Sequence, residues 1–302
     1  MHKCSPWVGL LAVGALSALP AAHAESFEQT VTADPHGEVD VSNVSGTIDV
    51  TGWDKPQVSV KADVSSSQKV LVTSERGHIS VRVTGGSGGV SLFGVGSIGS
   101  AHLQVWIPRT SELDVTAVSA DVTSKAMIGA QRLHSVSGEI TADVSGADTE
   151  IKTVSGDIKL VGNAQPGHFR IDSVSGEVHL RNAAGDLDAT TISGDLSAEL
   201  SPANNVHLHT TSGEITLTGR VGNGASIEAQ TVSGDVKLHG AASDGYEYEV
   251  RTFSGDIDDC FGKSAERNGQ YGPGKHLTGT LGQGGARLRV NTLSGDVSLC
   301  NH

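Results

Sequence analysis

The chain has 302 residues, of which 37% are hydrophobic and 4% aromatic, and its formal net charge is −13 at pH 7. An acidic protein is repelled by phosphate backbones and by anionic lipid headgroups. This balance therefore argues against nucleic acid and anionic membrane surfaces as partners. The composition suits a soluble protein outside the cytoplasm.

Residues 1–24 have the pattern of a secretory signal peptide. A basic start with Lys3 precedes an apolar run over 7–19, and a small-residue ending predicts cleavage after Ala24. Cys4 precedes the apolar run, whereas the cysteine of a lipoprotein signal would follow it. Cleavage leaves 278 residues with 34 acidic against 20 basic side chains, and no further apolar stretch long enough to span a bilayer. We therefore expect a periplasmic or secreted protein.

The segment 25–112 is expected to form a β region that is less regular than the rest of the chain. Alternating apolar residues predict short strands there, at 58–62, 70–73, 79–83 and 103–107. The Gly/Ser-rich stretch 85–100 interrupts them and is predicted to be a long mobile hairpin loop. Its larger apolar residues leave open a second role, as a loop that contacts a partner.

A five-residue motif, Val-Ser-Gly-(Asp/Glu)-apolar, dominates the rest of the chain, with an early copy at 44–48 and a degenerate one at 118–122. Its regular serines stand at 137, 155, 175, 193, 212, 233, 254 and 294, in steps of 18, 20, 18, 19, 21, 21 and 40 residues. Apolar residues recur six, four and one places before the serine, and three and five places after it. A fixed period of this size with β-type composition indicates a repeat architecture.

Within each run the apolar residues alternate, as in half-buried strands, and the parity changes by one between the runs. We place this change at the Thr or Ser before the motif, so that residues such as Val154 face the core. Each repeat is then two short strands joined at a bend, and stacking repeats about 4.8 Å apart buries both apolar rows. The sequence predicts an all-β fold with a β-solenoid over 113–302, in coils of about 18–21 residues. A β-sandwich and a β-propeller are the alternatives, although a propeller blade needs about 40 residues per repeat.

The period is broken near the C-terminus. Residues 261–285 are rich in glycine and poor in alternation, so we expect an insertion out of one coil, with an extra coil as the alternative. Cys260 and Cys300 each lie six places after a motif serine. If the segment is an insertion, their coils are neighbours and the two Cα atoms lie about 5 Å apart, within disulfide range. The sequence therefore predicts a Cys260–Cys300 disulfide, which an oxidising compartment permits.

Three features together carry a family likeness: the segment Gly46–Pro56 with its sequence GTIDVTGWDKP, the strand end Val105–Pro108, and the serial Thr-Val-Ser-Gly-Asp-Ile phrases. The chain resembles the bacterial putative-adhesin β-strand-repeat family, a domain of unknown function, over nearly all of residues 25–302. The resemblance implies a β-solenoid fold and a cell-envelope setting, sometimes linked to envelope-stress systems. It brings no catalytic residues.

The position two places after each motif serine is acidic in all eight regular copies. The members are Glu139, Asp157, Glu177, Asp195, Glu214, Asp235, Asp256 and Asp296. Stacked repeats place them in one row, where like charges about 4.8 Å apart repel by roughly 0.9 kcal/mol in water. Backbone N–H groups at the Ser-Gly bend, helped by basic residues two places on, would relieve this repulsion. Divalent cations or a partner bound along the row are the alternative.

Three other sets of residues are candidate sites. The Thr/Ser row two places before the motif serines is expected to bond between coils, because no repeat-specific His and Asp complete a triad. The histidines at 179, 207, 209 and 239 are expected to remain without a metal, although transition metals favour such ligands. A polysaccharide-cleaving enzyme would place acids and bases near the insertion, namely Asp256, Asp258, Asp259, Lys263, Arg267, His276, Arg287 and Arg289.

These observations favour a non-enzymatic envelope scaffold or binding rod that presents a repeated polar array to an envelope protein or glycan. We expect neither a cofactor nor a metal, and the sequence leaves the oligomeric state open. A sensor or ligand-binding module in envelope stress is one alternative. The other is a glycan-active β-helix enzyme that uses the C-terminal insertion, but an enzyme groove usually interrupts a repeat pattern more than this.

Overall fold

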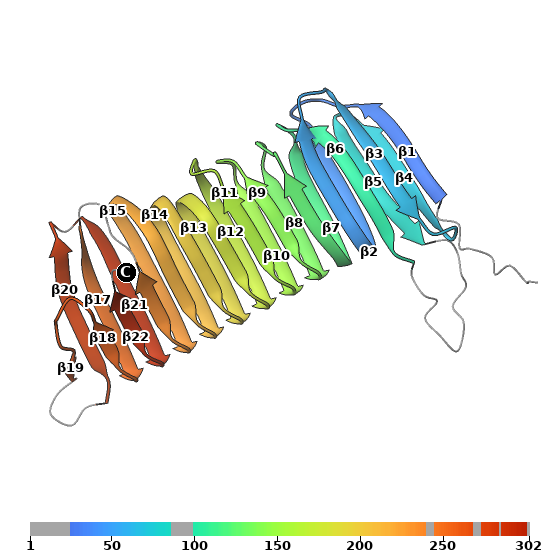
Figure 1. Cartoon of the computed structure of the whole chain (residues 1–302). Coiled ribbons are helices and arrows are strands. Elements are labelled where there is room, and N and C mark those ends of the chain that lie inside the picture. Colours follow the sequence, from blue (N-terminus) through green and yellow to red (C-terminus); the bar gives the residue numbers. More distant parts are fainter. Residues whose placement is uncertain (1–24, 86–98, 240–244, 268–272, 284, 301–302) are drawn as a thin grey trace, which may run out of the picture.

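The computed structural model describes residues 25–85, 99–239, 245–267, 273–283 and 285–300. Across these residues every regular element is a β-strand, so the predicted all-β class is confirmed (Figure 1). None of them belongs to a helix with the length and apolar composition needed to cross a membrane. The predicted signal peptide 1–24 and most of the loop 85–100 lie outside the described residues.

The first part of the chain forms β1 (Glu25–Thr32), β2 (Glu38–Trp53), β3 (Gln57–Val64), β4 (Gln68–Glu75), β5 (His78–Gly85), β6 (Ala101–Pro108) and β7 (Glu112–Lys125). The middle forms β8 (Gln131–Ser137), β9 (Ile140–Val144), β10 (Thr149–Ser155), β11 (Ile158–Gly162), β12 (Pro166–Ser175), β13 (Val178–Ser193), β14 (Leu196–Ser212) and β15 (Ile215–Ser233). The last part forms β16 (Val236–His239), β17 (Gly245–Ser254), β18 (Ile257–Asp259), β19 (Glu266–Arg267), β20 (Lys275–Gly282), β21 (Ala286–Ser294) and β22 (Val297–Cys300).

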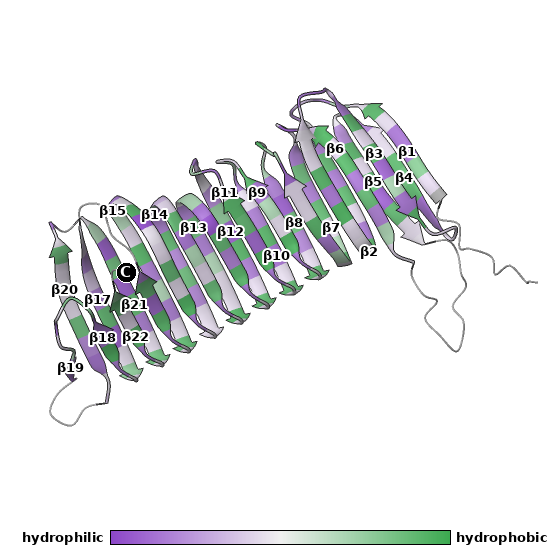
Figure 2. Ribbon diagram, viewed as in Figure 1, coloured by the Kyte–Doolittle hydropathy of each residue, from purple (hydrophilic) through white to green (hydrophobic). Residues whose placement is uncertain are grey.

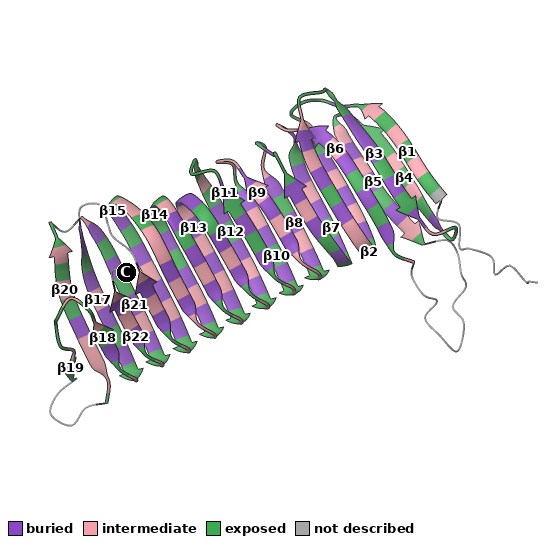
Figure 3. Ribbon diagram, in the orientation of Figure 1, coloured by how far each residue is buried: buried purple, intermediate pink, exposed green. Residues whose placement is uncertain are grey.

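The repeats pair side by side in two parallel ladders. In the first ladder the strand before each motif serine pairs with its counterpart in the next repeat, so that Ser137 stands opposite Ser155. The second ladder pairs the strands after the serine, as Ile140 and Ile158 do. Because the register is kept, side chains of one repeat position form rows across the strands. Figures 2 and 3 show these rows as bands of like hydropathy and like burial.

The core contains the positions six, four and two places before the motif serine and three and five places after it. In one repeat these are Phe169, Ile171, Ser173, Val178 and Leu180, none more than 4% exposed. The prediction that the residue before the serine faces the core is wrong. Val154 is 50% exposed, whereas its neighbour Thr153 is 4% exposed. The alternation therefore continues through the Thr, and the parity changes at the Ser-Gly-(Asp/Glu) bend.

Glycine allows the chain to bend at this point. Gly176 has a φ of +123°, and a Cβ on it would overlap the carbonyl oxygen of Gly156 in the neighbouring repeat. The bend brings the two ladders together, so little room remains on its inner side. Small Ser and Thr side chains fill that inner row, while the larger Val and Ile side chains lie outside.

At both ends of the stack the order in space departs from the order in the chain. β2 lies between β7 on one side and β5 and β6 on the other. β21 and β22 lie between β15 and β16 on one side and β17 and β18 on the other. The repeat of Ser294 thus sits between those of Ser233 and Ser254, and the predicted stacking in chain order fails at these places. β2 also pairs in register with β7 from Glu38 onward, so the ladders continue across the predicted boundary at 112/113.

Antiparallel strands close the two ends. β3 pairs with β6, β1 with β3, and β4 with β5 at the N-terminal end. At the C-terminal end β20 pairs with β17, and β19 with β20. The predicted insertion 261–285 therefore contains the end strand β20, with Leu277 buried in the core. Exposed sheet edges are sites of unwanted pairing, and these strands cover the parallel ladders.

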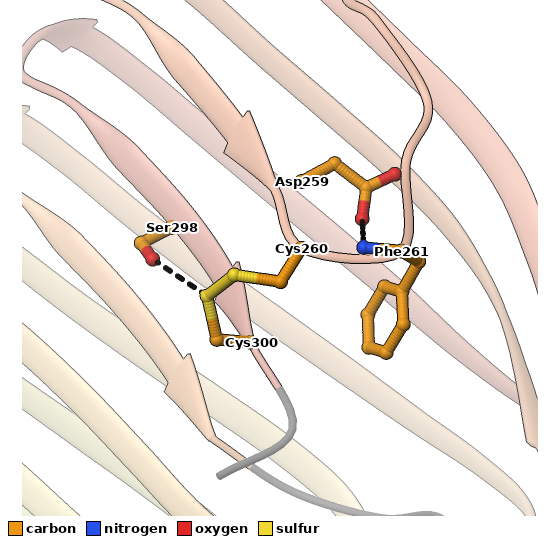
Figure 4. Close-up of a disulfide and its surroundings, with 5 residues drawn as sticks. All are labelled: Asp259, Cys260, Phe261, Ser298 and Cys300. Carbon is orange, nitrogen blue, oxygen red and sulfur yellow. Dashed lines mark hydrogen bonds between the residues drawn. A yellow bond between two sulfur atoms is a disulfide. The ribbon is translucent and has the colours of Figure 1, made fainter.

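The structure contains the predicted disulfide between Cys260 and Cys300, with Cα atoms 5.1 Å apart (Figure 4). The two residues meet because β18 and β22 are neighbours, and the N–H of Cys260 donates to the carbonyl oxygen of Leu299. Phe261 packs against the core beside the bridge. The disulfide joins the repeat that lies at the end of the stack to the C-terminal strand inserted beneath it.

Candidate functional site

The predicted carboxylate row exists, and its Asp members bond to the backbone. Asp157 Oδ1 accepts a hydrogen bond of 2.9 Å from the N–H of Glu177, and Asp195 Oδ1 accepts one of 2.8 Å from the N–H of Glu214. The same bond links the pairs Asp121 with Glu139, Asp235 with Asp296, and Asp296 with Asp256. Each of these Asp side chains thus ties its repeat to the next along the stack.

The Glu members of the row turn toward side chains instead. Lys159 Nζ lies 2.9 Å from Glu139 Oε2, Lys237 Nζ lies 2.6 Å from Glu214 Oε2, and His179 Nε2 lies 3.0 Å from Glu177 Oε2. The hydrogen bond from Lys159 lowers the pKa of Glu139, and that from Lys237 lowers the pKa of Glu214. Asp and Glu alternate over most of the row, so neighbouring carboxylates find different partners and their repulsion is relieved locally.

Among the described residues, a close cluster of three side chains that could together bind a metal lies outside the carboxylate row. Glu38, Asp40 and His78 approach one another at the N-terminal end. His78 Nε2 lies 3.0 Å from Asp40 Oδ2 and its Nδ1 lies 3.4 Å from Glu38 Oε2, so the three side chains already pair among themselves. Burial raises the pKa of Asp40. The row's role toward a cation stays a prediction.

A second row, which the sequence analysis missed, runs along the outer face of the first ladder five places before each motif serine. From the N-terminal end its members are Asp114, Arg132, Glu150, Arg170, Asp188, His207, Glu228, Arg289 and Glu249. The charges alternate, with His207 at a position where a base is expected. We call this the charged row. Cross-strand pairs of opposite charge stabilise a sheet by about 0.2–1 kcal/mol each.

The charged row ends in a hollow near the C-terminus, which we call the C-terminal hollow. It has a volume of about 710 Å³ and lies over β15, β21, β17 and β20. Three acids and three bases line it: Glu228, Glu247, Glu249, Lys263, Arg287 and Arg289. Arg289 Nε lies 3.5 Å from Glu249 Oε2, and Lys263 Nζ donates to the carbonyl oxygen of Thr278 at 3.3 Å. Its volume falls in the range of about 300–1,000 Å³ typical of small-ligand sites.

The hollow brings together only some of the residues predicted near the insertion. Lys263, Arg287 and Arg289 line it, but Asp256 pairs with Lys275 at the bend. Asp259 accepts a hydrogen bond of 3.1 Å from the Tyr248 hydroxyl, beneath the hollow. The glutamates that face the hollow were not predicted, although all three lie on the outward positions five or seven places before a motif serine.

The Thr/Ser row is buried, as its inward position requires. Thr252 Oγ1 donates to the carbonyl oxygen of Gly295 in the adjacent repeat at 3.2 Å. Ser135 and Ser173 donate within their own repeats. Five others have no hydrogen-bond partner among the described residues: Thr153, Thr191, Thr210, Thr231 and Thr292. The expected ladder of bonds between coils is therefore seen at Thr252 alone among the described members.

His207 and His209 do not approach a third metal ligand within the described residues. His207 Nδ1 instead lies 3.5 Å from Glu228 Oε2 in the charged row. His179 contacts Glu177 in the carboxylate row. These contacts make two of the four predicted histidines, His179 and His207, partners of carboxylates.

The sequence pattern of the Toastrack DUF4097 family matches residues 36–239 and, in a second and overlapping match, residues 206–300. The chain belongs to this family. Membership confirms the resemblance expected from the serial Ser-Gly-Asp phrases, and the matches cover both ladders from β2 to β22. A search of curated proteins finds no similar sequence.

Several solved structures are similar along most of their length. A putative adhesin from Bacteroides fragilis has 11% identity and a TM-score of 0.43, with 92% of this chain and 99% of that chain covered. A putative cell adhesion protein from Clostridium sporogenes has 10% identity and a TM-score of 0.25, with 91% and 98% covered. A putative lipid binding protein from Parabacteroides distasonis has 8% identity and a TM-score of 0.32, with 91% and 97% covered. TM-scores this low carry no functional argument for this member of the family.

Proposed function

We propose that this chain is a non-enzymatic binding rod of the cell envelope, periplasmic or secreted, with a glycan or protein of the envelope as its partner. The two ladders act as the walls of a β-solenoid in which each repeat makes one turn. The predicted signal peptide and the disulfide support an oxidising location outside the cytoplasm.

The C-terminal hollow is the observation that carries this proposal. It is the place where members of the charged row line a concave surface large enough for a ligand. Arg287 and Glu247 stand opposite each other in the register of β21 and β17, beside the pair Arg289 and Glu249. At each of these two positions, an Arg that donates hydrogen bonds therefore lies beside a Glu that accepts them.

The balance of charge in the hollow favours a polar ligand without a large net charge. Guanidinium groups only donate hydrogen bonds and ionised carboxylates only accept them. Vicinal hydroxyl groups of a sugar do both, so a neutral or zwitterionic glycan segment satisfies the two kinds of group together. Polar groups left unpaired on binding would lower affinity, which disfavours an apolar ligand here.

The test is retention of envelope components by the secreted form of the chain, residues 25–302. Envelope extract and an array of neutral and acidic glycans are passed over wild-type protein, Arg287→Ala and Arg170→Ala. Arg170 is the matched control, because it belongs to the charged row but lies outside the hollow. We expect Arg170→Ala to bind like wild type and Arg287→Ala to bind about tenfold more weakly, the loss of one good charged hydrogen bond.

Equal retention by wild type and Arg287→Ala would overturn the role of the hollow. A third variant, without residues 85–100, tests the alternative predicted for that segment, a loop that contacts the partner. If deleting this loop alone abolishes retention, binding belongs to the loop.

The hollow also favours one specific alternative, a glycan-active enzyme. It gathers three glutamates, Glu247 and Glu249 on β17 and Glu228 on β15 across the intervening β21. Glycosidases act through a pair of carboxylates flanking the scissile bond. In this alternative Glu247 and Glu249 are the acids to replace. An activity screen on acidic and neutral glycans, with Glu247→Gln, Glu249→Gln and the predicted Asp258→Asn compared, tests it. Cleavage that persists in both Glu variants would assign the activity elsewhere.

A further inference from the structure

The exposed residue before each motif serine forms a row along the bend that is apolar at nine of its ten positions. In spatial order the row contains Val44, Val118, Val136, Val154, Val174, Ile192, Val232, Leu293 and Phe253. Thr211 fills the position between Ile192 and Val232. The nine apolar members are 37% to 54% exposed. In Figure 3 the bend follows the exposed strand ends along the lower edge of the stack.

Such a row is unusual on a monomer. Nine large apolar side chains at ladder positions about 4.8 Å apart, interrupted at Thr211, present a strip rather than scattered contacts. The largest apolar patch of a typical monomeric protein covers about 300–600 Å², and larger ones mark interaction sites. Neither the hollow nor the carboxylate row uses these side chains, so they call for a partner of their own.

The spacing of the row selects the partner. Ten positions span about 43 Å at 4.8 Å each. An extended peptide repeats its side chains on one face every 6.6–6.8 Å or so and falls out of step within a few residues. A helix with apolar residues every 3.5 positions repeats at about 5.25 Å and drifts by about 4 Å over nine intervals. A second copy of this chain repeats at the same spacing and stays in step along the whole row.

The area also fits a second copy. Specific protein interfaces bury about 800 Å² on each partner. A strip about 43 Å long and 15–20 Å wide, comprising the apolar row and one row on each side, supplies close to this area. The row is therefore long enough for a stable contact only if most of its length is used, which a partner of matching period allows.

Charge decides the relative direction of the two copies. On one side the apolar row is flanked by the carboxylate row. On the other side lies the row three places before the serine, which contains His134, Lys152, Asp172, Thr190, His209, Gln230, Asn291 and Arg251. In an antiparallel pair carboxylate row would face carboxylate row. In a parallel pair, with the two-fold axis along the rod, each carboxylate row faces the mixed and partly basic row of the other copy.

We infer that the apolar row is the interface of a parallel, side-by-side homodimer, in which each residue of the row meets its own counterpart. The outer faces with the charged row and the C-terminal hollow remain available to a partner. The inference goes beyond the binding function and uses different residues.

The first test is the mass of the secreted form, residues 25–302, by analytical ultracentrifugation over a range of concentrations. Wild type is expected to be a dimer that dissociates on dilution. The double variant Val154→Lys and Ile192→Lys is expected to be a monomer with unchanged circular dichroism, because both side chains are half exposed. Leu71→Lys and Ile128→Lys are the matched controls, since these apolar residues are similarly exposed but lie outside the row. Both are expected to remain dimers.

The second test is cross-linking through single cysteines, since Cys260 and Cys300 are already bonded to each other. In a parallel dimer Val118→Cys links to itself under oxidation. In an antiparallel dimer it links to Leu293→Cys when the two variants are mixed, and not to itself. A wild-type monomer at every concentration, a dimer that survives the double Lys variant, or the antiparallel cross-link would each overturn the inference. Glycan retention is also measured for the double Lys variant. Because this variant tests binding without the apolar row, its result separates the proposed binding function from the dimer inference.

Discussion

Asp157 Oδ1 accepts a 2.9 Å hydrogen bond from the backbone N–H of Glu177, one repeat further along the stack. Glu177 itself does not continue this bond but turns its carboxylate to His179 Nε2 in its own repeat, 3.0 Å away. Both acids are exposed, but they have different partners: Asp157 accepts a backbone N–H of the next repeat, whereas the Glu177 carboxylate contacts a side chain.

This difference predicts unequal effects on stability. Asp157→Ala removes the acceptor of a backbone N–H and should lower the free energy of unfolding by about 1 kcal/mol, the usual net worth of one hydrogen bond. Glu177→Ala removes an exposed contact to His179 and should change it by less than about 0.5 kcal/mol. Urea unfolding of the two variants checks this. Equal losses would show that the backbone bond adds nothing beyond an exposed charge.

The bend glycines predict a larger loss. Gly176→Ala places a Cβ against the carbonyl oxygen of Gly156 at a φ of +123°, so neighbouring repeats must separate. We expect a loss of several kcal/mol or failure to fold. Gly224→Ala is the control, since its φ of +79° is also left-handed but its Cβ meets open space. That variant should lose only about 1–2 kcal/mol, the cost of the backbone conformation alone. Thermal melts that rank the two variants the other way would contradict the close approach at the bend.

Reducing the Cys260–Cys300 disulfide should loosen the C-terminal end first. The bridge closes a loop with a sequence separation of 40, for which chain entropy gives about 4 kcal/mol of stabilisation. Hydrogen exchange after mild reduction is expected to rise in β17, β18 and β22 and to stay low in β10 to β14. Cys260→Ser with Cys300→Ser should behave in the same way without reductant. Uniform faster exchange along the chain would mean that the stack unfolds as one unit.

Tyr248 predicts alkaline sensitivity. Burial first, and then its hydrogen bond to Asp259, raise the pKa of its hydroxyl to about 12. A raised pKa in the folded state means that the neutral hydroxyl is favoured there. Its stabilising contribution is complete below pH 10 and is lost as the pH rises from 10 to 12. The wild type should therefore lose on the order of 2 kcal/mol more than Tyr248→Phe over that interval. Parallel pH–stability curves for the two proteins would contradict the burial of this hydroxyl.

Chelation tests the predicted cation role of the carboxylate row. Asp oxygens in the row accept backbone N–H groups, and Glu139 and Glu214 pair with lysines, so the row is satisfied by the chain itself. We expect EDTA to leave the melting temperature unchanged. A fall of several degrees that calcium restores would assign the row to a divalent cation.

The repeat spacing, together with the β-type composition and the alternation, was enough to predict the all-β class and the carboxylate row. The serines at 137 and 155 stand opposite each other because the same position of neighbouring repeats meets in a ladder, although the repeats differ in length. The same counting predicted that Cys260 and Cys300 meet. Both results follow from period and register, which the sequence states directly.

The same pattern did not determine whether the residue before each motif serine faces the core or the solvent. Either Val154 or Thr153 could be the buried residue, depending on which side of it the alternation changes parity. The hydrophobicity of Val favoured Val154 as the core residue. The structure places Thr153 inside, because the Gly bend decides the facing and leaves the inner corner too narrow for a row of larger side chains. The exposed apolar row is the result of that choice.

The sequence by itself determined the spacing, the carboxylate row and the cysteine pair, because each depends on the distance between residues within one repeating pattern. Only the tertiary structure decided that β2 and β21 insert between strands distant in the chain, and that Arg287 and Glu247 meet at the end of the charged row. Pairing between strands that are far apart in the chain depends on which sheet edges are still unpaired during folding. No local periodicity encodes that order.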